Sequence, residues 1–115
     1  MFLPKLMHIR IDKEKLSGYV LNLNHPEGRH KARVFMSALG LTSSDASWLA
    51  QEIERALLSA RFEMQYETEW GVIYRAQLQI QRGDRCAKVR TVWLCTDQET
   101  RLVTCFVDGE CDESA

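Results

Sequence analysis

The residues best suited to chemistry lie in one stretch, from His25 to Arg33, which reads His-Pro-Glu-Gly-Arg-His-Lys-Ala-Arg. It holds two imidazoles and three permanent cations within nine positions. A neutral imidazole beside guanidinium groups can accept the proton of a ribose 2′-hydroxyl, while the cations stabilise a phosphorane-like transition state. This chemistry requires no metal or other cofactor. The stretch therefore predicts a site that binds or cleaves a phosphodiester.

The same stretch predicts a helix that begins near Pro26 and ends at Gly40. Its apolar positions recur with helical spacing and form a stripe that we expect to be buried: Ala32, Phe35, Met36 and Leu39. With this stripe facing inward, a rotation of about 100° per residue places His30 and Arg33 on the opposite side, with Lys31 on one flank. A basic helix face that is merely solvated is the alternative interpretation.

Two further helices and four strands are predicted around this segment. Helices are expected over residues 13–17 and 44–59, from cap residues and apolar spacing. After Arg61 the apolar period falls to two, which predicts strands over 62–70 and 74–80. Nearly continuous apolar runs predict two more central strands over 86–96 and 102–107, buried on both sides and joined to the others by short turns. The expected fold is α+β, with about three helices (residues 12–60) on one face of a four-stranded antiparallel meander (61–107). Residues 108–115 are expected to form a mobile acidic tail.

Composition limits the functions that the chain can have. It has 115 residues, a formal net charge of −1 and 27% charged residues, typical of one domain that does not coat nucleic acid by bulk charge. The excess of cations lies in residues 1–42, at +4. Glycine-rich nucleotide motifs, zinc-protease motifs and the serine-hydrolase elbow are all absent from the sequence. No apolar run reaches the ~18 residues that a membrane span needs, and we expect a cytoplasmic protein without a signal peptide.

The four cysteines are expected to be buried, reduced thiols. Cys86, Cys95, Cys105 and Cys111 contain no C-x-x-C pair, which argues against zinc. Three of them lie in apolar, strand-like runs, where a thiol behaves as a small hydrophobe. A cysteine nucleophile paired with a histidine is formally possible, although only Cys86 has cations nearby.

Several linked motifs resemble an uncharacterised bacterial domain family. They are Tyr19-Val-Leu-Asn22, His25-Pro-x-Gly28, His30-Lys-Ala-Arg-Val-Phe35, Ala38-Leu-Gly-Leu41, Val89-Arg-Thr-x-Trp93 and Leu102-Val-Thr104. The family's domains occur alone and at the C-terminus of large polymorphic toxins. Its layout of helices followed by an antiparallel sheet is similar to that of the barnase, EndoU, colicin and RelE-like ribonuclease toxins.

The resemblance implies a metal-independent endoribonuclease and a set of site residues. His30 is the first choice for general acid or base and His25 the second. Lys31, Arg33 and Arg90 would bind phosphate, and Thr91 or Thr104 would hold a phosphate oxygen. Because a strand alternates its faces, Arg90 and Thr91 cannot both point into one site without a bulge. RNA is the implied substrate, and a small inhibitor protein is an implied partner.

The alternative hypothesis is a non-catalytic protein interaction module or a neutral partner component of a toxin-type system. A ribonuclease requires His30 and at least one other of these groups to converge on a concave surface. An interaction module predicts instead that they are dispersed or paired internally, with an exposed apolar patch near Trp48 or Trp70. Oligomeric state is not predicted by the sequence.

Overall fold

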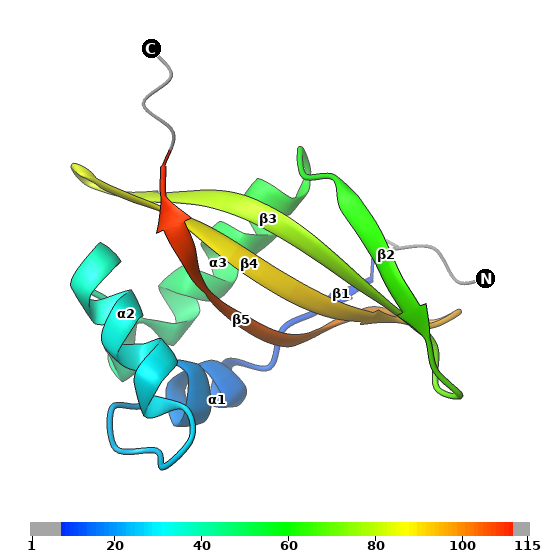
Figure 1. Ribbon diagram of the computed structural model, residues 1–115, viewed down its shortest axis with the longest axis horizontal. Helices are drawn as coiled ribbons and strands as arrows, with labels where there is room; N and C mark the ends of the chain where they lie inside the picture. The colour runs from blue at the N-terminus through cyan, green and yellow to red at the C-terminus, as the bar shows by residue number, and fades with distance from the viewer. Residues whose placement is uncertain (1–7, 112–115) are drawn as a thin grey trace.

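The computed structural model describes residues 8–111. Within this range the chain forms three α-helices, two other helical segments and five strands (Figure 1). In chain order these are β1 (Ile9–Arg10), α1 (Lys13–Lys15), the π-helical η1 (Leu16–Val20), α2 (Arg29–Leu39), the 3-10 segment η2 (Ser43–Asp45), α3 (Ala46–Leu57), β2 (Phe62–Glu67), β3 (Val72–Arg82), β4 (Arg85–Cys95) and β5 (Thr100–Glu110). None of the helices in this range has the length and apolar character needed to cross a bilayer.

The first helical region is longer than predicted. The helix expected to end near Gly18 continues as the π-helical turn η1, in which the Leu21 N–H donates to the Leu16 carbonyl at 2.8 Å. Leu16 and Val20 are both fully buried. Their burial accounts for a turn that local preference at Gly18 disfavours.

The second helix, α2, starts at Arg29, three residues later than the sequence suggests. Residues 25–28 form a turn instead, because the His25 side chain occupies the amides of Glu27 and Gly28. The predicted inward stripe is otherwise confirmed for Ala32, Phe35 and Leu39, although Met36 is 46% exposed. Gly40 closes the helix in the left-handed conformation, at φ 68°.

The third helix, α3, follows a capping box. The Thr42 N–H donates to Asp45 Oδ2 at 2.9 Å, and Arg82 of β3 reaches the same carboxylate at 3.3 Å. Leu49, Ile53 and Leu57 are fully buried along one side of the helix. The cap and this apolar face together fix α3 against the sheet.

The sheet has five strands in the order β1-β5-β4-β3-β2. The predicted α+β class and the antiparallel meander β2 to β5 are confirmed. The prediction of four antiparallel strands is wrong in one respect: β1 adds a fifth strand, parallel to β5, with Ile9 opposite Thr100. A two-residue strand is too short to show a period in the sequence.

The core lies between the helices and one face of the sheet. In Figure 1, α3 passes behind β3 and β4, and α2 lies beside β5. The side chains that point towards the helices are buried along β3, β4 and β5, and Trp93 is the largest of them. Alternate residues of these strands face the other way and are partly exposed. The expectation that the last two strands are buried on both sides is therefore wrong, because the helices cover only one face of the sheet. We call this uncovered side the open face.

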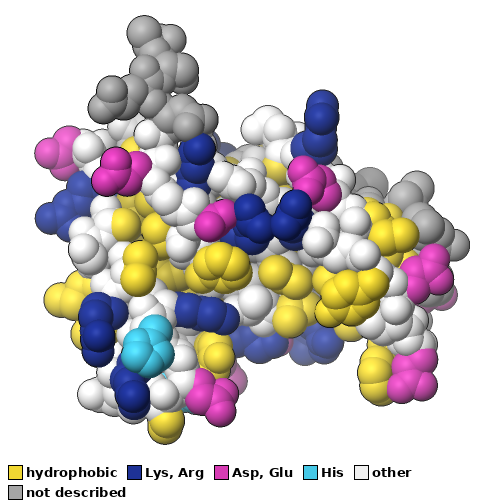
Figure 2. Space-filling model, viewed as in Figure 1, with side chains coloured by type: hydrophobic (Ala, Val, Ile, Leu, Met, Phe, Trp, Pro, Cys, Tyr) yellow, Lys and Arg dark blue, Asp and Glu magenta, His cyan; other side chains and the backbone are white. Residues whose placement is uncertain are grey.

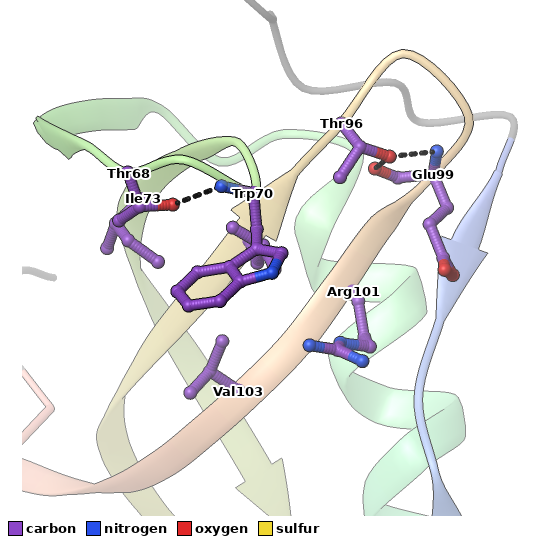
Figure 3. Close-up of a pocket in the computed structure, with 8 residues that line it drawn as sticks. Thr68, Trp70, Ile73, Thr96, Glu99, Arg101 and Val103 are labelled. Atoms are coloured by element: carbon purple, nitrogen blue, oxygen red, sulfur yellow. Dashed lines mark hydrogen bonds between the residues drawn. The ribbon is translucent and has the colours of Figure 1, made fainter.

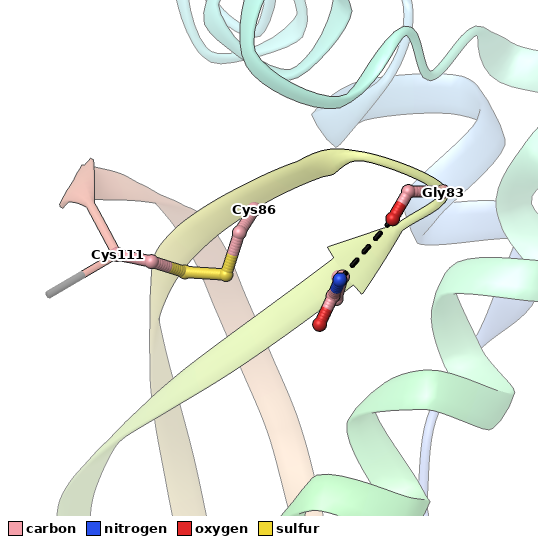
Figure 4. Close-up of a disulfide and its surroundings, with 4 residues drawn as sticks. Gly83, Cys86 and Cys111 are labelled. Atoms are coloured by element: carbon pink, nitrogen blue, oxygen red, sulfur yellow. Dashed lines mark hydrogen bonds between the residues drawn. A yellow bond between two sulfur atoms is a disulfide. The ribbon is translucent and has the colours of Figure 1, made fainter. Parts of the chain in front are cut away.

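The expectation that all four cysteines are reduced is wrong. Cys86 at the start of β4 and Cys111 after the end of β5 form a disulfide, with their Cα atoms 5.6 Å apart (Figure 4). Ala87 lies opposite Glu110 in the ladder, so the register brings together two cysteines separated by 25 positions. Cys95 and Cys105 are free and buried, as predicted. Residues 108–110, expected in the tail, belong to β5, and 112–115 lie outside the described residues.

Candidate functional site

The turn that leads into α2 is built around His25. The Nδ1 atom of His25 accepts the N–H groups of Glu27 at 3.0 Å and Gly28 at 2.9 Å. In the neutral ring the proton therefore lies on Nε2, which leaves His25 a hydrogen-bond donor. The ring packs edge-on against Tyr19, with centroids 4.6 Å apart. His25 thus shapes the start of α2 and also keeps an N–H donor at Nε2.

Gly28 permits the close approach of α2 to η1. A Cβ atom at this position would overlap the carbonyl oxygen of Tyr19. Any larger residue would push the start of α2 away from Tyr19. The glycine of the His25-Pro-x-Gly28 motif therefore sets the position of the residues that follow it.

Lys31 is held by groups from two elements, η1 and β5. Its Nζ donates to Thr104 Oγ1 of β5 at 2.9 Å and lies 5.4 Å from the Tyr19 ring centroid and 5.7 Å from that of Phe106. Two aromatic faces and a hydroxyl fix the ammonium while leaving donors for an anion. We call Tyr19, Lys31, Thr104 and Phe106 the lysine cage. His25 contacts this cage through Tyr19.

His30 and Arg33 lie on the exposed side of α2. Within residues 8–111 neither side chain has a hydrogen bond or an ion pair. About 100° of helix rotation separates His30 from Lys31, so the two side chains diverge. Only Lys31 of the three makes contact with the sheet, through Thr104.

Arg90 and Thr91 point to opposite faces of β4, as strand alternation requires. Thr91 is fully buried, where its hydroxyl donates to the Ala76 carbonyl and accepts from Trp93 Nε1, both at 2.7 Å. Arg90 lies on the open face and pairs with Asp108 at 2.8 Å. Thr91 is thus part of the core, whereas Arg90 is available to a ligand.

Of the seven residues singled out in the sequence, the structure joins two directly and a third through an aromatic ring. Lys31 bonds to Thr104, and His25 reaches them through Tyr19. Arg90 lies opposite Phe106 of the cage in the β4–β5 register. His30, Arg33 and Thr91 do not join this cluster.

An apolar pocket of about 500 Å³ opens on the open face beside Trp70 (Figure 3). Trp70 is 71% exposed, and its ring lies across the sheet towards Val103 and Arg101. The Thr68 hydroxyl accepts the Trp70 N–H at 3.2 Å and fixes the turn that carries the indole. We call this hollow the Trp70 pocket; Ile73, Leu94 and Glu99 also line it.

A second hollow on the open face is lined by three arginines. Arg61, Arg75 and Arg90 surround it together with Glu63 and Gln77, and its volume is about 270 Å³. Arg75 pairs with Glu63 at 3.0 Å, and Arg90 donates to Gln77 at 3.4 Å. We call this hollow the arginine pocket.

The described part of the chain contains no group of three or more His, Cys, Asp or Glu side chains arranged to hold a metal ion. A cysteine nucleophile is also disfavoured. Burial raises the pKa of the Cys105 thiol to about 12 and also raises that of Cys95, while Cys86 is oxidised.

Helices that cover one side of a largely antiparallel sheet, with a cationic open face on the other, define a small α+β domain. The chain belongs to the family described as a domain of unknown function, DUF6883, whose model matches residues 2–109. No curated protein and no solved structure matches the chain.

Sequence reasoning missed three residues that shape these surfaces, whereas it named Trp70 as one possible centre of an exposed apolar patch. Tyr19 and Phe106 are spaced like core aromatics, and only the packing of α2 against β5 shows that they surround Lys31. Arg75 alternates along a strand, and this signal does not distinguish a binding face from a solvated one.

Proposed function

We propose that this domain is a metal-independent endoribonuclease of toxin type that binds an RNA phosphate at the first turn of α2. The observation that carries the proposal is the charge of that turn. Arg29, His30 and Lys31 are its first three residues, and it contains no acid. Lys31 extends from it into the lysine cage at the margin of the open face.

Cations at the N-terminus of a helix oppose the helix dipole, at a cost of about 0.3–1 kcal/mol each. A phosphate bound there reverses the sign of the interaction. Sequences that break a local rule in this way commonly do so at functional sites. The arrangement thus favours an anionic ligand.

In the proposed reaction the ribose 2′-oxygen attacks the adjacent phosphorus to form a 2′,3′-cyclic phosphate, and the bond from phosphorus to the 5′-oxygen breaks as that oxygen takes a proton from water. The exposed His30 removes the 2′-hydroxyl proton, and because its side chain diverges from Lys31 the substrate has to bridge the two side chains across the first turn of α2. Lys31 and the Nε2–H of His25 stabilise the charge that develops on the phosphoryl oxygens. Arg33 and Arg90 contact flanking phosphates, and Thr104 positions Lys31. Thr91 takes no part because it is buried.

The test is induced expression in bacteria, with growth and total RNA followed together. Slowed growth with discrete RNA fragments is expected, and purified protein should cut RNA in EDTA. His30→Ala and Lys31→Gln should each lower the cleavage rate per folded molecule by about 10²–10⁴-fold, and His30→Ala should leave the melting temperature unchanged. Lys15→Gln, which removes an equal charge from exposed α1, is the matched control. Normal growth with intact RNA would refute the proposal.

A small acidic inhibitor is the partner expected for such an enzyme. It would cover the cations of α2 and Lys31, so its binding should weaken with salt. Co-expression with a small acidic protein encoded beside the gene should restore growth. The same protein should protect RNA in the purified assay.

A non-catalytic interaction module is the second candidate, and the exposed Trp70 supports it. A large aromatic in an apolar pocket with a charged rim has the character of a protein-binding hot spot. Under this candidate RNA stays intact on expression. Trp70→Ala would then abolish binding of the acidic partner, whereas Lys31→Gln would not.

A further inference from the structure

We infer that the open face binds a single-stranded nucleic acid segment, with a base stacked on Trp70 and backbone phosphate in the arginine pocket. This inference rests on the proposed function for its biological meaning, because it supplies the track along which a substrate would reach Lys31. Of the residues assigned to cleavage, it uses only Arg90, in the arginine pocket, and Lys31, at the end of the path.

The Trp70 pocket has the features of a stacking site. The indole is 71% exposed. The backbone of the turn that carries it is fixed, because the Thr68 hydroxyl accepts the N–H groups of Trp70 and Gly71. A fixed, exposed ring presents a flat surface at little conformational cost. The remaining wall is formed by Ile73, Leu94 and Val103.

The arginine pocket has the features of a phosphate site. Arg75 and Arg90 each bond one carboxylate, Glu63 and Asp108 respectively. A guanidinium has five N–H donors, so both retain donors for a phosphate. The Nε of Arg90 is buried and has no hydrogen-bond partner. That atom has no solvent exposure, so an oxyanion in the pocket would instead accept from the remaining N–H groups of the partly exposed Arg75 and Arg90 guanidinium groups.

The two pockets are adjacent on one surface. Ile73 lines the Trp70 pocket and Arg75, two positions along β3, lines the arginine pocket, so both side chains face the same way. On the neighbouring strands Arg90 lies opposite Phe106, and Phe106 contacts Lys31. A continuous path therefore runs from Trp70 to the lysine cage. Figure 2 shows a hydrophobic band across the sheet with Lys and Arg on both sides of it.

Charge favours a nucleic acid over an apolar partner. The residues that line the two pockets and the cage, together with Asp108, include five cations and three acids, whereas the chain as a whole carries −1. The cations are Arg61, Arg75, Arg90, Arg101 and Lys31. Aromatic rings on a sheet with flanking cations bind unstacked bases and their phosphates, which a duplex does not offer.

The experiment measures binding by fluorescence anisotropy with a labelled 2′-O-methyl RNA octamer, which lacks the 2′-hydroxyl needed for cleavage. A DNA octamer of the same sequence is the second arm. Trp70→Ala should weaken binding about 5- to 100-fold. The double variant Arg75→Gln/Arg90→Gln should lower the slope of log K against log salt by about 1.4. Leu58→Ala and Arg55→Gln, on exposed positions of the helical side, are the matched controls and should bind like the wild type.

Each outcome has a defined meaning. Binding of either octamer that depends on Trp70 supports the inference, and equal binding of both shows that base and phosphate suffice. Such binding without RNA cleavage by the wild type refutes the ribonuclease and leaves the inference standing. Absence of binding at low salt, binding that is insensitive to Trp70→Ala, or a surface that binds only an acidic protein would overturn it. Trp70 is exposed, so its substitution is expected to leave the melting temperature unchanged.

Discussion

The hydroxyl of Thr91 joins two polar groups that have no access to water. It accepts the indole N–H of Trp93 and donates to the carbonyl of Ala76, and both Thr91 and Trp93 are fully buried. Thr91→Val keeps the shape of the side chain and removes the hydroxyl. The Trp93 N–H is then left in the core without a partner.

The expected cost follows from that unpaired donor. A buried donor that loses its partner destabilises a protein by about 1–3 kcal/mol. At about 4 °C per kcal/mol for a domain of this size, the melting temperature should fall by about 4–12 °C. Thr91→Ser keeps the hydroxyl and loses one buried methyl group, which costs about 0.8 kcal/mol. The valine variant should therefore be the less stable of the two.

Urea and thermal unfolding followed by circular dichroism measure both variants. A valine variant as stable as the wild type, or a serine variant less stable than the valine variant, would refute the reasoning. RNA cleavage measured per folded molecule gives an independent readout. Loss of cleavage in Thr91→Val at unchanged stability would mean that Thr91 belongs to the catalytic site, which its burial contradicts.

Three further predictions concern local interactions. His25→Ala should lose about 1 kcal/mol in urea unfolding because two amides lose their acceptor, whereas His25→Asn, whose oxygen can accept the same amides, should retain most of it. Asp45→Asn should cost about 1 kcal/mol at pH 7. The Thr42 N–H and then the Arg82 guanidinium lower the pKa of the Asp45 carboxyl. The difference in stability between the wild type and Asp45→Asn should therefore disappear as the pH falls below 3.8, the ordinary pKa of this carboxyl. Cys111→Ser should lower the stability by about 3 kcal/mol relative to the oxidised wild type and should match the reduced wild type, which is the control, since the disulfide closes a loop of 25 positions.

The helices and the meander could be predicted because their signals are local. The stripe of α2, its glycine cap, the period-two pattern of β2 and β3 and the apolar runs of β4 and β5 all follow from the spacing of neighbouring residues. The start of α2 was misplaced because His25 competes for the amides that a helix start leaves free. β1 was missed because its two residues form a strand only by pairing with the edge of β5.

The candidate site could be predicted only in part. The sequence identifies Lys31 and Thr104 as polar groups on a helix and a strand, but their bond spans 73 positions. His30, one residue before Lys31, has the more suggestive side chain and yet makes no such contact. Neighbouring residues of a helix point about 100° apart, so the side chains of His30 and Lys31 do not meet at one point.

By itself the sequence determined the fold class, the order of the main elements and the alternation that separates Arg90 from Thr91, because these depend on periods of two and 3.6 residues. Tertiary structure alone decided the Cys86–Cys111 pairing, the cage around Lys31 and the open face with Trp70. Those features depend on strand register and on which face the helices cover. Register and layer packing are set by contacts between distant segments, and no local pattern encodes them.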